Sequence, residues 1–254
     1  MILKKILQKL ETEEDFPALK CPLCENGYLK TLTKDEISFT SEKTRKYYEI
    51  AGEPTDLKGG FAKLLLCDNS ECLEKAIVVG KTDTVENGYD DGVDPETGEE
   101  LYPGEETYKS KYRIEYISLP VNLISVPENI DKELLENIQS SYNLFWSDIN
   151  SCGNRLRTVV ELLLDKIEFP PAKTLNIRLD KLKNDTNNKY HTFFEKFDAI
   201  RLLGNEATHN FNTIDKIDVI KLYEVIEYCI TEIYSTRHFE IENLTNELKD
   251  KYKK

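Results

Sequence analysis

Two pairs of cysteines are the residues of this sequence with the clearest chemistry. Cys21 and Cys24 enclose a Pro-Leu dipeptide, and four residues separate Cys67 from Cys72. Turn-forming residues lie beside each pair, which lets the two thiolates of one loop face the same point. Two such loops complete a tetrahedral shell, with each sulfur about 2.3 Å from a zinc ion. The sequence therefore predicts structural zinc bound by Cys21, Cys24, Cys67 and Cys72.

The alternatives for these cysteines are four reduced structural thiols or a pair of disulfides. Disulfides belong to oxidising compartments, and no secretory signal supports them here. Catalytic zinc is disfavoured because four thiolates leave no open position for water. A metal cross-link also suits a β-rich module of about 100 residues, whose own core is thin. Cys152 and Cys229 fall at apolar helical positions, and we expect both in the core.

A second group of polar residues lies in the segment 193–209. Arg201, Asn205 and His209 follow one another at intervals of four residues, so on a helix they form one polar row. Gly204 stands inside the same segment, where it costs about 1 kcal/mol relative to alanine. A helix keeps such a glycine most readily where another backbone or a ligand must come close. We therefore treat Arg201, Asn205 and His209 as candidate catalytic residues, with Gly204 in support.

Arg157 and Glu161 show the same four-residue spacing on an earlier predicted helix. They are expected to form an ion pair, or to reach the row on the later helix. In one interpretation the row is a hydrogen-bonded packing seam, with His209 holding the following loop. In the other it belongs to a metal-independent ribonuclease, where His209 takes a proton from a 2′-hydroxyl and Arg201 stabilises charge on phosphorus. The residue types leave both interpretations open.

The predicted secondary structure that positions these residues changes from strands to helices near Pro120. Turn signals occur before that point at Asn26-Gly27, Asn87-Gly88 and Gly59-Gly60. They separate short runs of β-forming residues at 28–33, 36–41, 61–67, 75–80 and 112–119. After Pro127 the apolar spacing becomes helical, over 130–150, 154–167, 174–183, 190–209 and from about 215 onward.

This change predicts an α+β protein, with a small β-rich, zinc-ribbon-like module followed by an α-helical bundle. An amphipathic helix is expected over residues 1–14, the zinc module over 15–120 and the bundle over 128–254. The first residues lack the unbroken apolar run and cleavage site of a signal peptide. No stretch approaches the roughly 18 to 20 apolar residues that span a bilayer. The sequence thus favours a cytoplasmic protein without membrane segments.

The net charge of -13 is concentrated in one stretch. Residues 83–106 contain ten acidic and no basic side chains, which leaves the remainder nearly balanced. We expect this stretch to be a solvated acidic loop, because its spacing does not match a calcium-binding EF-hand loop. A negative net charge argues against nucleic-acid binding. This argument is weaker here, because one loop supplies most of the negative charge. Phosphate-cradling glycine loops, HExxH and GxSxG motifs are all absent from the sequence.

The order of these motifs resembles the domain-of-unknown-function 4145 family, a branch of the HEPN-like helical superfamily. The resemblance rests on a CPxC…C zinc module, a VPENI…Y entry, R-x3-E at Arg157 and Glu161, and IR-x2-GN-x3-H from Ile200 to His209. It covers roughly residues 120–235 well and the zinc module less well. It implies a bundle of four or five helices, a homodimer, and a role in bacterial conflict systems such as restriction and antiviral defence.

Catalytic members of that superfamily carry arginine and histidine separated by four to six residues. Here those positions hold Leu202, Leu203 and Gly204, and the nearest arginine, Arg201, directly precedes them, with seven residues between it and His209. Three functional hypotheses follow. The first is an RNA endonuclease that acts as a homodimer through Arg201, Asn205 and His209. The second is a non-catalytic zinc-containing module that binds a partner protein or nucleic acid. The third is a structural zinc protein whose polar row only packs.

Overall fold

The structure is a computed structural model that describes residues 2–12, 16–89, 106–209, 214–235 and 237–252. Side chains are described for these residues except 11–12, 33–36, 51, 89, 207–209 and 237–243. The chain folds as an antiparallel sheet followed by helices, so the predicted α+β class is confirmed. In the described part of the chain, no helix has the length and apolarity needed to cross a membrane.

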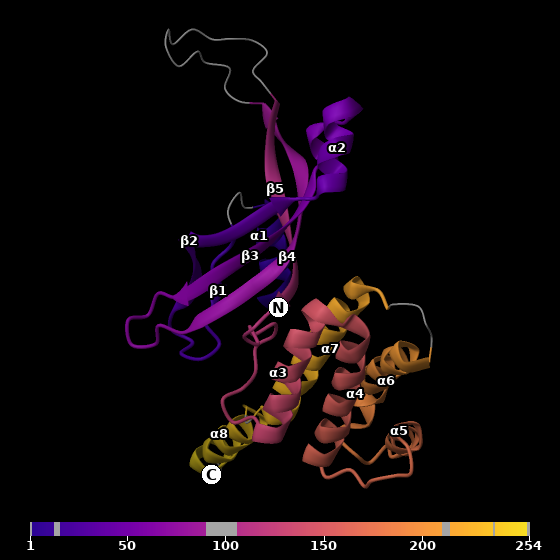
Figure 1. The fold of residues 1–254 in the computed structure, drawn as a ribbon. Helices are drawn as coiled ribbons and strands as arrows, with labels where there is room; N and C mark the ends of the chain where they lie inside the picture. Colours follow the sequence, from indigo (N-terminus) through magenta and orange to yellow (C-terminus); the bar gives the residue numbers. More distant parts are fainter. Residues whose placement is uncertain (1, 13–15, 90–105, 210–213, 236, 253–254) are drawn as a thin grey trace. The chain divides into compact units, whose positions relative to one another are not determined.

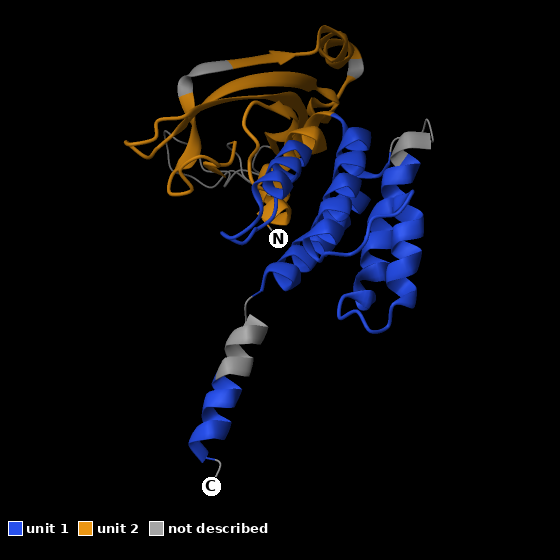
Figure 2. Cartoon of the chain, turned by 90° about the horizontal axis from the view of Figure 1, so that it is seen from below, with its two compact units in different colours: residues 1, 123–141, 148–254 blue, residues 2–122, 142–147 orange. Residues whose placement is uncertain are grey.

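Two compact units make up the described chain (Figure 2). One consists of residues 2–122 and 142–147 and contains the sheet; we call it the sheet unit. The other consists of residues 123–141 and 148–254 and contains the helices of the second half; we call it the helical unit.

The sheet unit is built on five antiparallel strands in sequential order (Figure 1). The strands are β1 (Leu19–Lys20), β2 (Tyr28–Thr40), β3 (Lys58–Cys67), β4 (Lys75–Tyr89) and β5 (Glu106–Ile117). Helix α2 (Glu42–Ala51) and the 3-10 turn η1 (Pro54–Asp56) connect β2 to β3. Such a sheet has no crossover, because each strand pairs with its neighbour in sequence.

Alternate side chains of the strands form the core of the sheet unit. Phe61, Leu65 and Cys67 of β3 are buried, whereas the residues between them, apart from Lys63, are only partly covered. Helix α1 (Ile2–Thr12) packs against β5, and its Leu3, Ile6 and Leu10 are buried. The spacing of these three side chains at three and four residues places them on one helix face, as the sequence predicts.

The helical unit contains most of the helices. They are α3 (Lys132–Ser147), whose last six residues group with the sheet unit, α4 (Ile149–Lys166), α5 (Leu175–Asn184), η2 (His191–Phe193), α6 (Phe194–His209), α7 (Lys216–Tyr234) and α8 (Arg237–Tyr252). Helix α4 packs against α6 and α7, and α5 packs against α6. Buried side chains of α4 include Leu156, Val159 and Leu163, which continue the helical spacing read from the sequence.

Several local expectations differ from the structure. Gly59-Gly60 and Asn87-Gly88 lie inside β3 and β4, and Gly88, with φ of +95°, occupies an irregularity of the ladder rather than a turn. The acidic loop expected over 83–106 begins and ends in strands, because β4 extends to Tyr89 and β5 starts at Glu106. Strand pairing sets Asp83 opposite Lys111, which offsets the acidic charge there. Residues 90–105 lie outside the described residues.

Helices α2 and α8 were not predicted. Residues 42–51 include Tyr47 and Tyr48 and follow a β-like run, but they form a helix across the end of the β2–β3 pair. Helix α8 carries little apolar patterning over its full length and lies after the last predicted stripe.

Gly80 is the position of the sheet where a larger side chain should be tolerated least. A Cβ atom there would lie 2.1 Å from the Arg113 carbonyl oxygen and 2.8 Å from the Phe61 ring. We expect Gly80→Ala to lower the free energy of unfolding by about 1–3 kcal/mol, because backbone must move to admit the methyl group. Denaturant unfolding measures the effect. Lys81→Ala on the same strand, with an exposed side chain, should change stability by less than about 1 kcal/mol.

Candidate functional site

The first cysteine pair lies on a tight turn after β1. The Cys21 amide donates to the Gly27 carbonyl oxygen at 3.0 Å and closes this turn. The Gly27 amide points at the Cys24 sulfur, 3.3 Å away. Gly27 must be glycine on steric grounds, because a Cβ atom would lie 2.5 Å from the Cys67 sulfur. The turn therefore directs both thiols and leaves room for the second pair.

The second pair lies where β3 ends and a short turn begins. The Cys72 and Leu73 amides both donate to the Asn69 carbonyl oxygen at 3.0 Å, which folds the turn back toward Cys67. Asp68 ties this turn to the first one, because its carboxylate accepts the Tyr28 amide at 2.7 Å and an ion pair from Lys30 at 2.7 Å. These hydrogen bonds hold the two loops side by side.

The four sulfur atoms of these loops converge on one point. Cys21 and Cys72 sulfurs are 3.9 Å apart, and Cys24 and Cys67 sulfurs are 3.6 Å apart. All four lie within 4.8 Å of one another. Four sulfurs around one zinc ion would be about 3.8 Å apart, whereas a disulfide needs roughly 2.05 Å. The cluster is thus close enough to hold a metal ion, and its thiols are not joined in disulfides.

The surroundings of the cluster shift the pKa values of two of its thiols in opposite directions. Backbone N–H groups of Asn26 and Gly27 lower the pKa of the Cys24 thiol to about 6. Burial, together with neighbouring thiols, raises the pKa of the Cys67 thiol to about 12. Four thiolates at such short range repel one another strongly unless a cation lies between them. A metal dication is the partner that this donor set fits.

Cys152 and Cys229 lie apart from the cluster and are fully buried, as the sequence predicts. Burial raises the pKa of each thiol to about 12. The Cys152 sulfur lies 3.3 Å from the Tyr223 hydroxyl and 3.4 Å from the Ser141 carbonyl oxygen. Neutral, buried thiols of this kind belong to the core.

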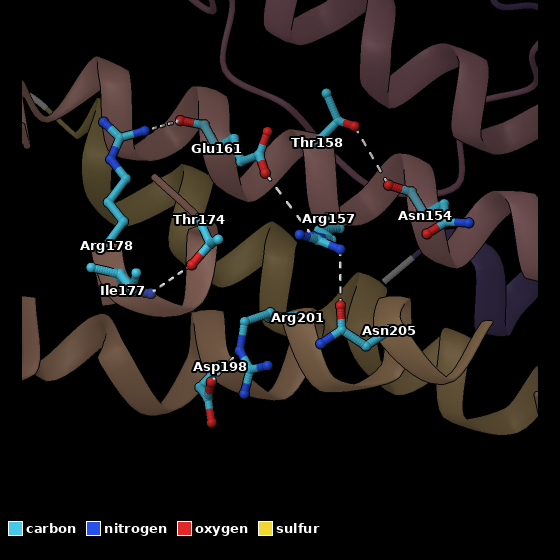
Figure 3. A network of polar contacts seen from close by, with 10 residues as sticks. All are labelled: Asn154, Arg157, Thr158, Glu161, Thr174, Ile177, Arg178, Asp198, Arg201 and Asn205. Carbon is cyan, nitrogen blue, oxygen red and sulfur yellow. Dashed lines mark hydrogen bonds and ion pairs between the residues drawn. The ribbon is translucent and has the colours of Figure 1, made fainter. Parts of the chain in front are cut away.

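On the helices, Arg201 and Asn205 of the predicted row are bonded within the helical unit (Figure 3). The Arg201 Nε donates to Asp198 at 2.7 Å, one turn earlier on α6, and only 13 % of the Arg201 side chain is exposed. Arg157 points from α4 toward α6, where its Nη1 donates to the Asn205 Oδ1 at 2.9 Å. The Arg157 Nε lies 4.0 Å from Glu161, which is a long ion pair.

Gly204 explains how α4 and α6 approach closely enough for these bonds. A Cβ atom on Gly204 would lie 3.1 Å from the Arg157 Cβ and 3.1 Å from the Gly153 carbonyl oxygen. The absence of a side chain at Gly204 therefore allows close approach of helix α4 of the same chain.

The histidines of the sequence lie in different settings. His209 ends α6, but its side chain and that of His238 lie outside the described residues. His191 is half-buried, and its Nδ1 lies 2.9 Å from the Asn188 carbonyl oxygen. The structure thus gives Arg201 and Asn205 definite partners and says nothing of the imidazole of His209.

Sequence reasoning missed Arg178. Its side chain is almost fully buried where α4 meets α5, and it donates to the Asp165 carboxylate at 2.7 Å and to the carbonyl oxygens of Glu161, Phe169 and Pro170. A lone arginine in a short amphipathic helix gives no signal of burial. A cleft of about 440 Å³ adjoins it, and its lining includes Arg157, Glu161, Asp165, Lys173 and Arg178.

The fold and these sites define an α+β protein with a four-cysteine cluster in its sheet and a polar row between two of its helices. Residues 139–254 match the model of a domain of unknown function, DUF4145, as the motifs predict. Residues 9–113 match a second domain of unknown function, DUF8608. The two matches divide the chain much as its change from strands to helices does.

A curated relative is the spindle assembly checkpoint component MAD1 of Candida albicans. It is 31 % identical over 96 residues, which is 34 % of this chain and 14 % of that protein. The chain therefore corresponds to a small part of that relative. No solved structure matches the chain.

The cysteine cluster leads to a direct prediction. Purified protein should contain about one tightly bound metal ion per chain, because four thiolates form one closed shell. We expect Cys24→Ser to lower both the metal content, measured by inductively coupled plasma mass spectrometry, and the melting temperature. Cys229→Ala is the matched control, because it removes a thiol outside the cluster. Equal metal loss in both variants would contradict the assignment.

The close approach of α4 and α6 can be tested at Gly204. Gly204→Val should lower the free energy of unfolding by about 1–3 kcal/mol, since its side chain must displace the Gly153 backbone. Leu202→Val, at an exposed position of the same helix, should stay within roughly 0.5 kcal/mol of the wild type. Equal effects of the two substitutions, measured by urea unfolding, would mean that the helices are not in tight contact at Gly204.

Proposed function

We propose that the protein is a non-catalytic, zinc-containing interaction module. The observation that carries this proposal is the bonding of the polar row. Asp198 neutralises the Arg201 guanidinium within α6, and Asn205 accepts from Arg157, which joins α6 to α4. A catalytic arginine must instead reach the charge that develops on its substrate.

Zinc is the metal that the cysteine cluster favours, because it binds four thiolates tetrahedrally and structural sites of this kind are closed. Bound there, zinc would supply a structural cross-link between the two loops. The free state of all four thiols fits a reducing compartment such as the cytoplasm. Cobalt substitution tests the geometry, since tetrahedral thiolate coordination gives a distinctive visible spectrum that Cys24→Ser should abolish.

A second candidate is a HEPN-like, metal-independent endoribonuclease that acts as a homodimer in a bacterial defence or restriction-type system. It is favoured by the continuity of α6 from Phe194 to His209. An unbroken helix sets Arg201, Asn205 and His209 on one face at one-turn intervals. In this function His209 would move the proton of the 2′-hydroxyl, and Arg201 would have to exchange Asp198 for the phosphate.

An RNA cleavage assay distinguishes the two candidates. Wild-type protein and His209→Ala are incubated with single-stranded RNA and transfer RNA in the presence of a chelator that does not strip the zinc. The interaction module predicts no cleavage by either protein. Cleavage by the wild type, with a loss of more than about 100-fold in His209→Ala, would overturn the first proposal in favour of the second.

The Arg201 substitution gives a separate readout. If Arg201 serves packing, Arg201→Ala should lower the free energy of unfolding by about 1–3 kcal/mol, because Asp198 loses its partner in a half-buried position. A variant that melts like the wild type but loses RNA cleavage would instead identify Arg201 as functional.

A further inference from the structure

One row of apolar residues crosses the face of the sheet opposite to the buried one. Ile37 of β2 pairs with Ala62 of β3, Ala62 pairs with Val79 of β4, and Val79 pairs with Tyr116 of β5. Paired residues in adjacent strands point to the same face. Phe39, Leu64 and Ile77 lie on this face beside the row. We call these seven residues the outer face.

The outer face is exposed. The exposed fraction is 69 % for Ile37, 64 % for Phe39, 52 % for Ile77 and 46 % for Tyr116. Their neighbours along the strands, such as Phe61 and Val78, point to the other face and are buried. In β3 and at the start of β4 this exposure follows strand register, whereas residues 37–40 of β2 are exposed on both faces.

An apolar outer face is unusual for such a sheet. An antiparallel sheet that buries one face on its core commonly presents polar side chains on the other. Here α1 lies with the buried residues, and the outer face remains apolar over four strands. Contiguous exposed apolar surface of this kind marks an interaction site.

The shape of the outer face suits another sheet. The Phe39 ring lies across Gly60, since a Cβ atom on Gly60 would be 2.6 Å from the ring. Phe39 is therefore flat against β3 rather than upright. Sheet faces pack against one another at about 10 Å with interlocking side chains.

Charges beside the outer face are paired within the sheet. Lys81 contacts Glu115 at 2.6 Å, and Arg113 contacts Asp83 at 3.1 Å. Each of these two pairs is neutral, although the whole chain carries -13. The two pairs therefore add no like-charge repulsion between identical copies, whereas the exposed Lys75, opposite Leu66 on the same face, adds a positive charge near Ile77.

We propose that the outer face binds the same face of a second copy of this chain, sheet against sheet. The four most exposed side chains present on the order of 500 Å² of apolar surface per chain. Two copies would bury up to about 1,000 Å² from these side chains, which is the lower limit for a specific interface. A two-fold interface joins identical patches, so an exposed apolar face can complement itself. This inference goes beyond the proposed function and depends on neither the zinc site nor the polar row.

The test measures the mass of the full, metal-loaded chain by sedimentation velocity over a range of concentrations. We expect a species of twice the 29.5 kDa chain mass. Ile77→Lys and Ile37→Lys should each raise the dimer dissociation constant more than about tenfold, because each buries two unpaired ammonium groups. Ile50→Lys is the matched control, since Ile50 is 85 % exposed on α2, outside the outer face. A monomer at all concentrations, or a dimer indifferent to the first two substitutions, would overturn the proposal.

A photo-crosslinking amino acid at position 116 identifies the occupant directly. Equal amounts of isotopically light and heavy chains are mixed, irradiated and analysed by mass spectrometry. Mixed light–heavy crosslinks to residues 37–39, 62–64 or 77–79 are the expected result. Crosslinks confined to residues 123–254, or to one chain, would show that something else covers the face. Unchanged metal content and melting of the lysine variants would show that the fold is intact.

Discussion

The convergence of four thiols is the constraint on which the sheet unit depends. Cys24 and Cys67 are distant in sequence, yet their sulfurs lie 3.6 Å apart where the ends of β1 and β3 meet. Hydrogen bonds of Asp68 and the absence of a side chain at Gly27 shape the two loops around this point. Four thiolates at this range repel one another unless a cation lies between them, and the cluster is close enough to hold a metal ion.

A second constraint, the close approach of α4 and α6, organises the helical unit. Gly204 allows the helices to meet, and the bond from Arg157 to Asn205 then fixes their rotation. Polar groups at such a contact are held in place because an unpaired one would be costly to bury. Asn205, one of the residues that first suggested catalysis, thus takes part in the contact of α4 with α6.

Both faces of the sheet carry apolar side chains, but only one face is buried in the core. Inward residues such as Leu65 build the core against α1, whereas outward residues such as Ile37 remain apolar and exposed. Stability of the single chain does not require the outward set. A surface of this kind is kept apolar when it is covered in the working state, which is the basis for assigning it to a second copy.

The sequence by itself determined the elements that depend on local spacing. The amphipathic helix α1, the helices α4 and α7 and the two cysteine pairs follow from periodicity and from the chemistry of neighbouring residues. The spacing of the cysteines also limited the metal site to four ligands, since each loop supplies two thiols.

Tertiary structure decided which residues meet. Gly59-Gly60 favours a turn locally, but strand pairing on both sides places it within β3. Arg178 is unremarkable in sequence and becomes buried only because the end of α4 surrounds it with carbonyl oxygens. Asn205 of α6 accepts from Arg157, which lies 48 residues earlier on α4. Such choices depend on distances between segments, which no local pattern contains.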